Sequence, residues 1–489
     1  MEAAALRASL TDDARGERPL FRVLADELAE RIREGELAAD TRLPAERTLA
    51  RQLAVSRGTV VAAYDELRAA GLVATRQGSG TVVARGHTTL SGPREAELAR
   101  LLRSDHGLTS LMTPGTAIDM RAAHLPDLRD LPAAAFDLAP VVPDLLRSHG
   151  YHRDGTDRLR IAIASHLTRT DRPTSPEEIL VTTGAQQAIW LVVCLLVERG
   201  GTVVVPELCY PGALDALRST DARIRSVPVG PRGVDVDALD RIVRTEQPRL
   251  VYLDPTAQNP TGRTMPAHAR RRLVRLAPEW STLVVEDNTL APIHLGNPPP
   301  PSLSAIAGEA GGELPVMTVG SASKWLWGGL RVGWIRGPGP LLERLARMKA
   351  VMDLASSVPG QIIAARLLDD ADTILAGRLV EVRRRYDALA DSVSQLLPDW
   401  EWTEPDGGLS LWVRLPDGAS SFDLVAEASR NGVAVAPGPV SSTESRHVDH
   451  LRLPYCQPPD VAREAVARLA RSWDEVRRRH TGLAPAARV

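Results

Sequence analysis

Apolar positions in the first part of the chain recur at helical spacing and then change to the spacing of strands. Segments with an apolar residue every three or four positions predict three helices between residues 17 and 71. The third of them begins after Ser56, a favourable N-cap residue. In 72–83 apolar and polar residues alternate around glycines, which predicts a short hairpin. Three helices followed by a two-stranded ribbon describe a winged helix-turn-helix domain, which we place at 17–85.

The rest of the chain has a different pattern. Residues 86–117 hold turn formers around one short helical stretch, which indicates a linker. From 118 to 475, short apolar segments alternate with helical ones, which predicts an α/β fold: a large, mainly parallel sheet covered by helices, followed by a smaller α+β portion. The expected strands are 179–182, 202–205, 250–253, 283–286 and 317–319 in the large sheet, and 409–413 and 433–436 in the smaller portion.

Composition excludes several other classes of protein. The 489 residues are 44% hydrophobic and 25% charged, which is typical of a globular protein. The longest apolar run, 188–197, is about half of what a bilayer requires, so no membrane span is expected. The first residues carry charges and no apolar core, unlike a secretory signal. Three cysteines without metal spacing predict no disulfide scaffold and no metal site, and they favour a cytoplasmic protein.

Charge is distributed unevenly along the chain. The formal net charge is −2, yet residues 42–85 hold seven arginines and three acids, a local excess of four positive charges. Such an excess favours binding to nucleic-acid phosphates. The start of the third helix adds hydroxyls, backbone amides and a guanidinium, from Ser56, Arg57 and Thr59. The alternative is a helical dimerisation or ligand module with solvated arginines.

Residues 42–80 resemble the GntR family of DNA-binding regulators. Their sequence, RLPAERTLARQLAVSRGTVVAAYDELRAAGLVATRQGSG, follows the signature of that family almost from end to end. The resemblance implies contacts with operator DNA from one turn, from the start of the third helix and from the wing. The residues at these positions are Arg47, Ser56, Arg57, Thr59 and Gly78.

Lysine is nearly absent from the chain. Of the 59 basic residues only Lys324 and Lys349 are lysines. Lys324 follows an apolar strand and is flanked by Ser321 and Ser323, with Arg331 seven residues further on. A Schiff-base lysine needs a dry pocket, and nearby hydroxyls and a guanidinium suit a phosphate. Lys349 lies in an ordinary amphipathic helical pattern, so we expect it to be solvated.

Other candidate residues follow the predicted strands. In VTTGAQQAI a strand leads through a Gly turn to the start of a helix, whose free amides can bind a phosphate. Asp287 ends an apolar strand, where a buried carboxylate needs a cation such as a pyridinium; a helix cap is the alternative. Asn259 lies in a turn and can donate to a ring hydroxyl, and Tyr210 can stack on a flat cofactor.

Together these motifs resemble the fold-type-I pyridoxal-phosphate enzymes of the aspartate aminotransferase superfamily. The NPTG and SxSK…R motifs have the order and distance of that family. The resemblance implies that Lys324 forms the internal aldimine with pyridoxal 5'-phosphate (PLP), that Asp287 pairs with the pyridine nitrogen, and that Asn259 binds the ring oxygen. It also assigns Tyr210 to the ring, Ala185, Gln186, Ser321, Ser323 and Arg331 to the phosphate, and Tyr151 to the phosphate of the other subunit.

Two more positions concern the substrate side and the ring oxygen. Arg452 matches the arginine that clamps a substrate carboxylate; the alternative is a structural arginine paired with Asp449. The family usually has a tyrosine two or three residues after the pyridine aspartate, whereas Thr289 lies here. Thr289 can donate to the ring oxygen from a less favourable place, so the departure concerns transaminase turnover and not cofactor binding.

A GntR-type winged helix joined to an aminotransferase-like domain is the architecture of MocR/GabR-type regulators. This resemblance implies a cytoplasmic homodimer that binds operator DNA and PLP and responds to an amino compound or to PLP itself. One alternative is a catalytically active aminotransferase with an accessory DNA-binding domain. Another is a repressor whose aminotransferase-like part is only a dimerisation scaffold, although a scaffold has no use for a buried lysine.

Overall fold

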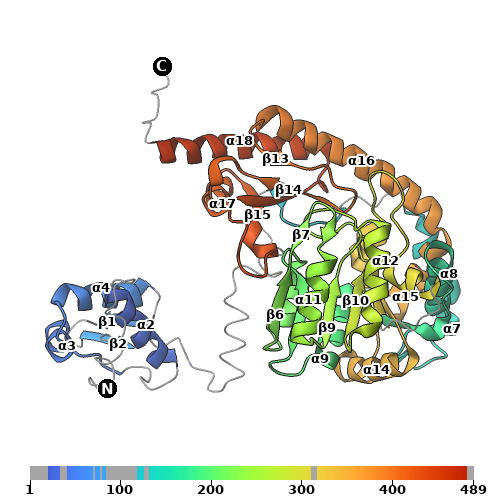
Figure 1. Ribbon diagram of the computed structural model, residues 1–489, viewed down its shortest axis with the longest axis horizontal. Helices are drawn as coiled ribbons and strands as arrows, with labels where there is room; N and C mark the ends of the chain where they lie inside the picture. The colour runs from blue at the N-terminus through green and yellow to red at the C-terminus, as the bar shows by residue number, and fades with distance from the viewer. Residues whose placement is uncertain are drawn as a thin grey trace. The chain divides into compact units, whose positions relative to one another are not determined.

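The chain divides into two compact units, residues 1–104 and 105–489 (Figure 1). The expected linker, 86–117, and the wing residue Gly78 lie outside the described residues. Within the described ranges, no helix combines the length and the hydropathy that a membrane span requires. The computed structural model describes residues 20–33, 41–69, 72–76, 80–83, 118–125, 131–309 and 316–481.

The first unit has the predicted three helices and two-stranded ribbon. Apolar residues at helical spacing, such as Leu24 and Leu28, are buried in one core with Leu49 and Leu67. Ser56 caps the third helix, because its Oγ accepts the backbone N–H of Thr59 at 3.0 Å. The elements are α2 (Leu20–Arg33), α3 (Glu46–Leu53), α4 (Arg57–Ala69) and the antiparallel pair β1 (Val73–Arg76) and β2 (Gly80–Val83).

A seven-stranded sheet forms the centre of the second unit, in the order β4-β12-β11-β10-β9-β5-β6. Six strands are parallel, and β12 runs antiparallel between β4 and β11. The five expected strands are all present; β6 and β12 are additional. The strands are β4 (Ile179–Thr182), β5 (Thr202–Pro206), β6 (Arg223–Val227), β9 (Leu250–Leu253), β10 (Leu283–Asp287), β11 (Val316–Ser321) and β12 (Gly333–Arg336).

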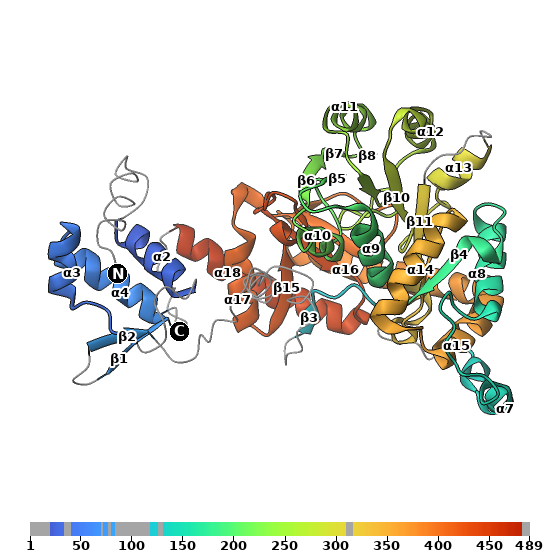
Figure 2. The same ribbon diagram turned by 90° about the horizontal axis from the view of Figure 1, so that it is seen from below.

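Helices cover both faces of this sheet. Because side chains alternate along a strand, Val203 and Val205 pack against one layer of helices and Val204 packs against the other. Figure 2 shows the two layers on opposite sides of the strands. Burial on both faces explains why these strands are continuous apolar segments. One layer holds α9 (Ala185–Leu196), α10 (Pro211–Arg218) and α14 (Gly339–Asp353); the other holds α11 (Val236–Glu246), α12 (Ala267–Leu276) and α13 (Leu303–Glu309).

The smaller portion of the second unit contains a five-stranded sheet in the order β13-β14-β16-β15-β3. Two of its strands, β14 and β15, are those expected from the sequence, and β16 carries Arg452. The strands are β3 (Ile118–Met120), β13 (Glu401–Trp402), β14 (Ser410–Arg414), β15 (Val433–Pro437) and β16 (His450–Pro454). The helices of this portion are α16 (Ala371–Leu396), α17 (Ser421–Arg430) and α18 (Pro459–Thr481), whereas α8 (Asp157–Thr170) and α15 (Val358–Asp369) pack against each other and α8 contacts β4 of the large sheet (Figure 1).

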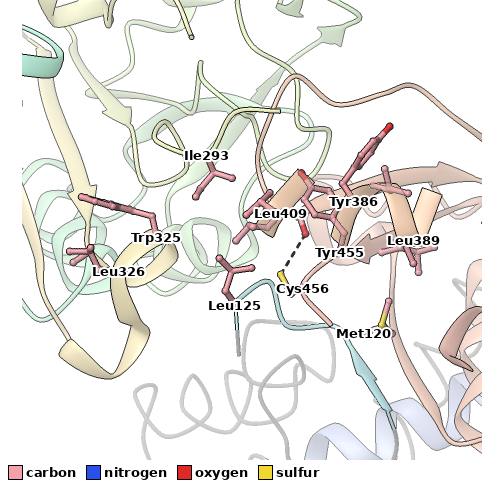
Figure 3. Close-up of a cluster of buried hydrophobic side chains, with 14 of the residues drawn as sticks. Met120, Leu125, Ile293, Trp325, Leu326, Tyr386, Leu389, Leu409, Tyr455 and Cys456 are labelled. Carbon is pink, nitrogen blue, oxygen red and sulfur yellow. Dashed lines mark hydrogen bonds between the residues drawn. The ribbon is translucent and has the colours of Figure 1, made fainter. Parts of the chain in front are cut away.

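One apolar cluster supports the segment that carries Lys324 (Figure 3). Trp325 and Leu326 follow Lys324 directly and are buried in this cluster, which also contains Leu409 of the smaller portion. Cys456 donates from its Sγ to the carbonyl of Leu409 at 3.8 Å, shown as a dashed line. The turn after β11 is therefore fixed on a dry core, which holds the lysine at the end of its strand.

Candidate cofactor and DNA-binding sites

Polar residues at the strand ends meet at one edge of the large sheet. Parallel strands end on the same side, so the side chains that follow them lie close together. They line a cavity of about 130 Å³, which also includes Tyr252 and Asp254, two residues that the sequence did not predict. The predicted cofactor residues in its lining are Ala185, Gln186, Tyr210, Asn259, Asp287, Thr289, Ser321, Ser323, Lys324 and Arg331.

Lys324 is held at this cavity by a backbone contact. Its Nζ donates to the carbonyl of Ala123 at 2.9 Å. Burial lowers the pKa of Lys324; the charges of Arg452 and Arg331 act in the same direction, and Asp287 acts against them. A lowered pKa makes the neutral, nucleophilic amine available at lower pH than in an exposed lysine.

Asp287 is bound from two directions. Its Oδ1 accepts the backbone N–H of Thr289 at 2.9 Å within a turn; no helix begins there, so Asp287 is not the helix cap that was the alternative. Its Oδ2 accepts the hydroxyl of Tyr252, on the neighbouring strand β9, at 2.7 Å. Burial, with the charge of Asp287, raises the pKa of Tyr252 well above its ordinary value, so the phenol stays a donor. The carboxylate is thus oriented before any ligand pairs with it.

The turn between β4 and α9 lines part of the cavity and is the candidate anion-binding turn. Gly184 has φ +84°, and a Cβ there would lie 3.0 Å from Nη2 of Arg331. The same nitrogen donates to the carbonyl of Thr183 at 3.0 Å, and Gln186 donates to the carbonyl of Gly212 at 2.8 Å. Free N–H groups at the start of α9, together with the guanidinium, suit a phosphate.

Several buried polar atoms at this cavity have no hydrogen-bond partner within the described part of the chain. They are Oε1 of Gln186, Oδ1 of Asp254, Oγ1 of Thr289 and Oγ of Ser323. Buried polar groups in native proteins almost always have partners, so these atoms indicate a polar ligand. A phosphorylated pyridine with a ring hydroxyl offers donors and acceptors of this kind, and the residues therefore fit PLP.

Arg452 lies beside the cofactor residues. Its Nη1 donates to Oδ1 of Asn259 at 3.3 Å and its Nη2 donates to the carbonyl of Arg121. The side chain is buried, and burial lowers its pKa. The alternative pairing with Asp449 is not what the structure has, since Asp449 accepts from Arg414 instead. A buried guanidinium beside the candidate ring-oxygen ligand is suitably placed for a second anchor point on a ligand.

Two residues differ from the other candidates: one does not line the cavity, and the other is buried although the sequence predicts it to be solvated. Tyr151 is 63% exposed and does not line the cavity, so its contact with the phosphate of another subunit stays a prediction. The expectation that Lys349 is solvated is wrong: it is fully buried, with its Nζ 3.0 Å from Oδ1 of Asp353. Lys349 lies on the same helical face as Leu342 and Leu345, which is the face that the sheet covers.

The DNA-binding candidates lie at the exposed start of α4 and on α3. Nη2 of Arg57 donates to Oε2 of Glu46 at 3.0 Å, and the side chain of Arg57 is 57% exposed. The hydroxyls of Ser56 and Thr59 are 2.8 Å apart. Arg47 is also exposed. Ser56, Arg57 and Thr59 lie at a helix N-terminus, where free amides can meet a phosphate.

Comparisons with known proteins decide the family. Residues 147–469 match the family model of aminotransferase class I and II, and residues 21–83 match that of the bacterial regulatory proteins of the gntR family. The "Probable rhizopine catabolism regulatory protein MocR" of Rhizobium meliloti is 31% identical over 449 residues, which are 86% of this chain and 86% of that protein. The chain belongs to the MocR-type transcriptional regulators.

Other relatives of this regulator match the second unit. The 2-aminoadipate transaminase of Thermus thermophilus is 35% identical over 297 residues, 60% of this chain and 73% of that one. The crystal structure of LysN, an α-aminoadipate aminotransferase from the same species complexed with N-(5'-phosphopyridoxyl)-L-leucine, superposes with a TM-score of 0.70 at 30% identity and covers 78% of this chain and 97% of that chain. The fold-type-I prediction is confirmed. PLP is the cofactor of this family, and the regulator is a PLP-dependent, DNA-binding one.

Proposed function

We propose that this regulator attaches PLP at Lys324 and senses an amino compound there. The observation that carries the proposal is a cavity with a buried lysine and unpartnered polar atoms, in a chain that also has a winged helix. When bound, PLP supplies an aldehyde that takes up amines reversibly. Capture of an effector amine then changes the population of dimer conformations and with it the DNA affinity.

Different residues of the cavity are proposed to bind different parts of PLP. Asp287, oriented by Tyr252, would pair with the pyridine nitrogen. Asn259 and Thr289 would bind the ring oxygen, and Tyr210 would stack on the ring. The start of α9 and the groups around it would hold the phosphate, namely Ala185, Gln186, Ser321, Ser323 and Arg331.

The effector carries a carboxylate, and Arg452 receives it. A pocket that discriminates among amines needs a second anchor, and a guanidinium matches a carboxylate with two parallel hydrogen bonds. Arg452 is buried next to Asn259, and its Nε has no partner among the described residues. An α-amino acid supplies both the amine for the cofactor and the carboxylate for this arginine.

The working form is a cytoplasmic homodimer. Large apolar side chains that one copy leaves exposed, such as Leu146 at 81% and Val351 at 89%, are of the kind that subunit contacts cover. Exposed Tyr151 then reaches the phosphate in the partner, as the family resemblance implies. Two winged helices in one dimer read paired DNA half-sites, with Arg47, Ser56, Arg57 and Thr59 as the contacting residues.

The test compares the wild type with Lys324→Ala. Borohydride reduction of the PLP-loaded wild type followed by peptide mapping is expected to label Lys324. A duplex selected from a random library by the wild type then reports DNA affinity by fluorescence anisotropy, with and without PLP and a panel of α-amino acids. The wild type responds to an amino acid, whereas Lys324→Ala binds the duplex without responding. A label on Lys349 alone, or an equal response in the variant, contradicts the proposal.

A working aminotransferase is the second candidate function. The cavity favours it, because Lys324 and Asp287 line it together and Arg452 lies beside it. Thr289, where the family usually has tyrosine, argues for a single conversion without turnover. Incubation of the PLP-loaded protein with an amino acid and a keto acid distinguishes the two: keto acid product beyond one equivalent per site identifies an enzyme.

A further inference from the structure

The second lysine of the chain is connected to the turn in front of α9. Lys349 on α14 is fully buried, and its ammonium lies 3.0 Å from Oδ1 of Asp353. Oδ2 of Asp353 accepts from Nε2 of Gln187 at 2.8 Å and from the hydroxyl of Thr183 at 3.3 Å. The carboxylate therefore joins the buried ammonium to two residues that flank the anion-binding turn.

Gln187 completes the connection to that turn. Its Oε1 accepts the backbone N–H of Thr183 at 2.8 Å, so one amide group binds both Asp353 and the turn. The carbonyl of Thr183 accepts from Arg331, a predicted phosphate ligand, at 3.0 Å. Gly184, which comes next in the chain, lines the cavity. Hydrogen bonds thus run without a break from Lys349 to the phosphate end of the cavity.

The residue type at position 349 is informative. Elsewhere in the chain every basic residue except Lys324 is an arginine. An ammonium is a compact point charge that reaches a partner four residues away on the same helix, whereas a planar guanidinium needs more room and a wider set of acceptors. A charged side chain is rarely fully buried unless it is paired, and its loss leaves the partner carboxylate uncompensated.

We propose that Lys349 is a positioning residue for the phosphate of PLP. Its ammonium holds Asp353, Asp353 holds Gln187 and Thr183, and these two fix the turn so that the first N–H groups of α9 stay directed at the phosphate. The proposal rests on the proposed function only in that the cavity holds PLP. According to this proposal, Lys349 affects the binding of the phosphate and not the reaction of Lys324 with the aldehyde.

The test compares PLP with pyridoxal, which lacks the phosphate. Dissociation constants of both are measured by absorbance titration of the apo full-length chain. Breaking a hydrogen-bonded charged contact is expected to weaken PLP binding roughly tenfold to a hundredfold in Lys349→Met and in Gln187→Leu, while pyridoxal binding stays within about twofold of the wild type. The ³¹P resonance of bound PLP is expected to shift in both variants.

The matched control is Arg347→Met on the same helix. Arg347 pairs with Glu343 at 3.0 Å on the exposed side of α14, so its loss is expected to change neither constant. Equal losses for PLP and pyridoxal, or unchanged PLP affinity with a lower melting temperature, identify a purely structural ion pair and overturn the proposal.

Two further outcomes are decisive. If Lys349→Met does not fold, Gln187→Leu, which leaves the ion pair intact, decides by the same comparison. If the wild type binds neither compound, the proposed function fails together with this inference. If the wild type binds PLP and both variants match it for both compounds, only the role of Lys349 fails.

Discussion

The two units of this regulator present their functional polar groups in opposite ways. At the start of α4, Arg57 is exposed and paired with Glu46, and the hydroxyls of Ser56 and Thr59 bind each other. In the cavity, polar atoms such as Oγ1 of Thr289 are buried and without a partner in the described residues. Exposed pairs exchange partners at little cost, whereas buried groups without partners are costly. The first arrangement suits a polyanion that binds and leaves, and the second suits a small ligand that completes the site.

The largest effect is therefore expected beside the cavity, from Arg452→Ala. Removing one member of a buried charge pair costs about 2–5 kcal/mol of binding free energy. Spectral titration of the PLP-loaded protein with α-amino acids, and with matched amines that lack the carboxylate, measures the loss of preference for the amino acids. Arg414→Ala is the control, because Arg414 is exposed and pairs with Asp449. If the wild type prefers the amines, or if Arg452→Ala keeps the preference for amino acids, Arg452 does not bind the carboxylate of the effector.

A smaller effect is expected in the first unit, from Arg57→Ala. If Arg57 reads a base edge, its loss costs roughly 1–3 kcal/mol of DNA binding and lowers the salt dependence slightly. Anisotropy titrations at several salt concentrations measure both quantities. Arg68→Ala is the control, since Arg68 lies at the far end of α4 and pairs with Asp65. Retained affinity with an unchanged salt dependence in Arg57→Ala means that another surface binds DNA.

The sequence predicted the parts of the fold that are buried on both faces. The five expected strands of the large sheet are continuous apolar segments because helices cover both of their faces. The sheet-edge strand β6 was missed, since its sequence RIRSV alternates and is only partly buried. β12 was missed because it is a four-residue strand with glycine and arginine at its ends.

The sequence predicted most of the site residues that follow a strand or end one. It missed the polar residue that lies within a strand. Lys324, Asp287 and Asn259 follow apolar strands or end them, and all three line the cavity. Tyr252 lies inside the apolar strand β9, and Asp254, which follows that strand directly, was overlooked. Lys349 was misjudged because spacing assigns a residue to a helical face, while only packing shows that the sheet covers this face.

The stability of the second unit is expected to depend on pH through a buried histidine on α8. His166 is buried and stacks on Trp325, with ring centroids 5.3 Å apart, and burial lowers the pKa of His166 to about 4. Between pH 6.5 and 4 the unfolded state binds more protons than the folded state, so the free energy of unfolding falls as pH falls through this window. At pH 5 this group alone removes about 2 kcal/mol relative to pH 7.

The measurement is urea unfolding of the wild type and of His166→Phe at pH 7 and pH 5. The phenylalanine keeps a ring against Trp325 and cannot titrate, so the variant is expected to lose less stability between the two pH values. His149→Phe, an exposed position, is the control and is expected to follow the wild type. Equal losses in wild type and His166→Phe would show that other groups cause the acid sensitivity.

The smallest effect is expected from Tyr252→Phe, which changes one hydrogen bond at Asp287. The carboxylate keeps the backbone N–H of Thr289 but loses the hydroxyl that orients its Oδ2. Because Asp287 is the residue proposed to pair with the pyridine nitrogen, the loss is expected in PLP affinity, at about 0.5–1.5 kcal/mol, or a few-fold to roughly tenfold. The matched control is Tyr455→Phe, whose hydroxyl donates to the carbonyl of Gly407 at 3.3 Å in a buried position that does not line the cavity. Both variants lose a buried hydroxyl, so their melting temperatures are expected to fall alike while only Tyr252→Phe binds PLP more weakly. Equal PLP affinity in the two would mean that Tyr252 serves the packing of β9 and that Asp287 needs no orientation from it.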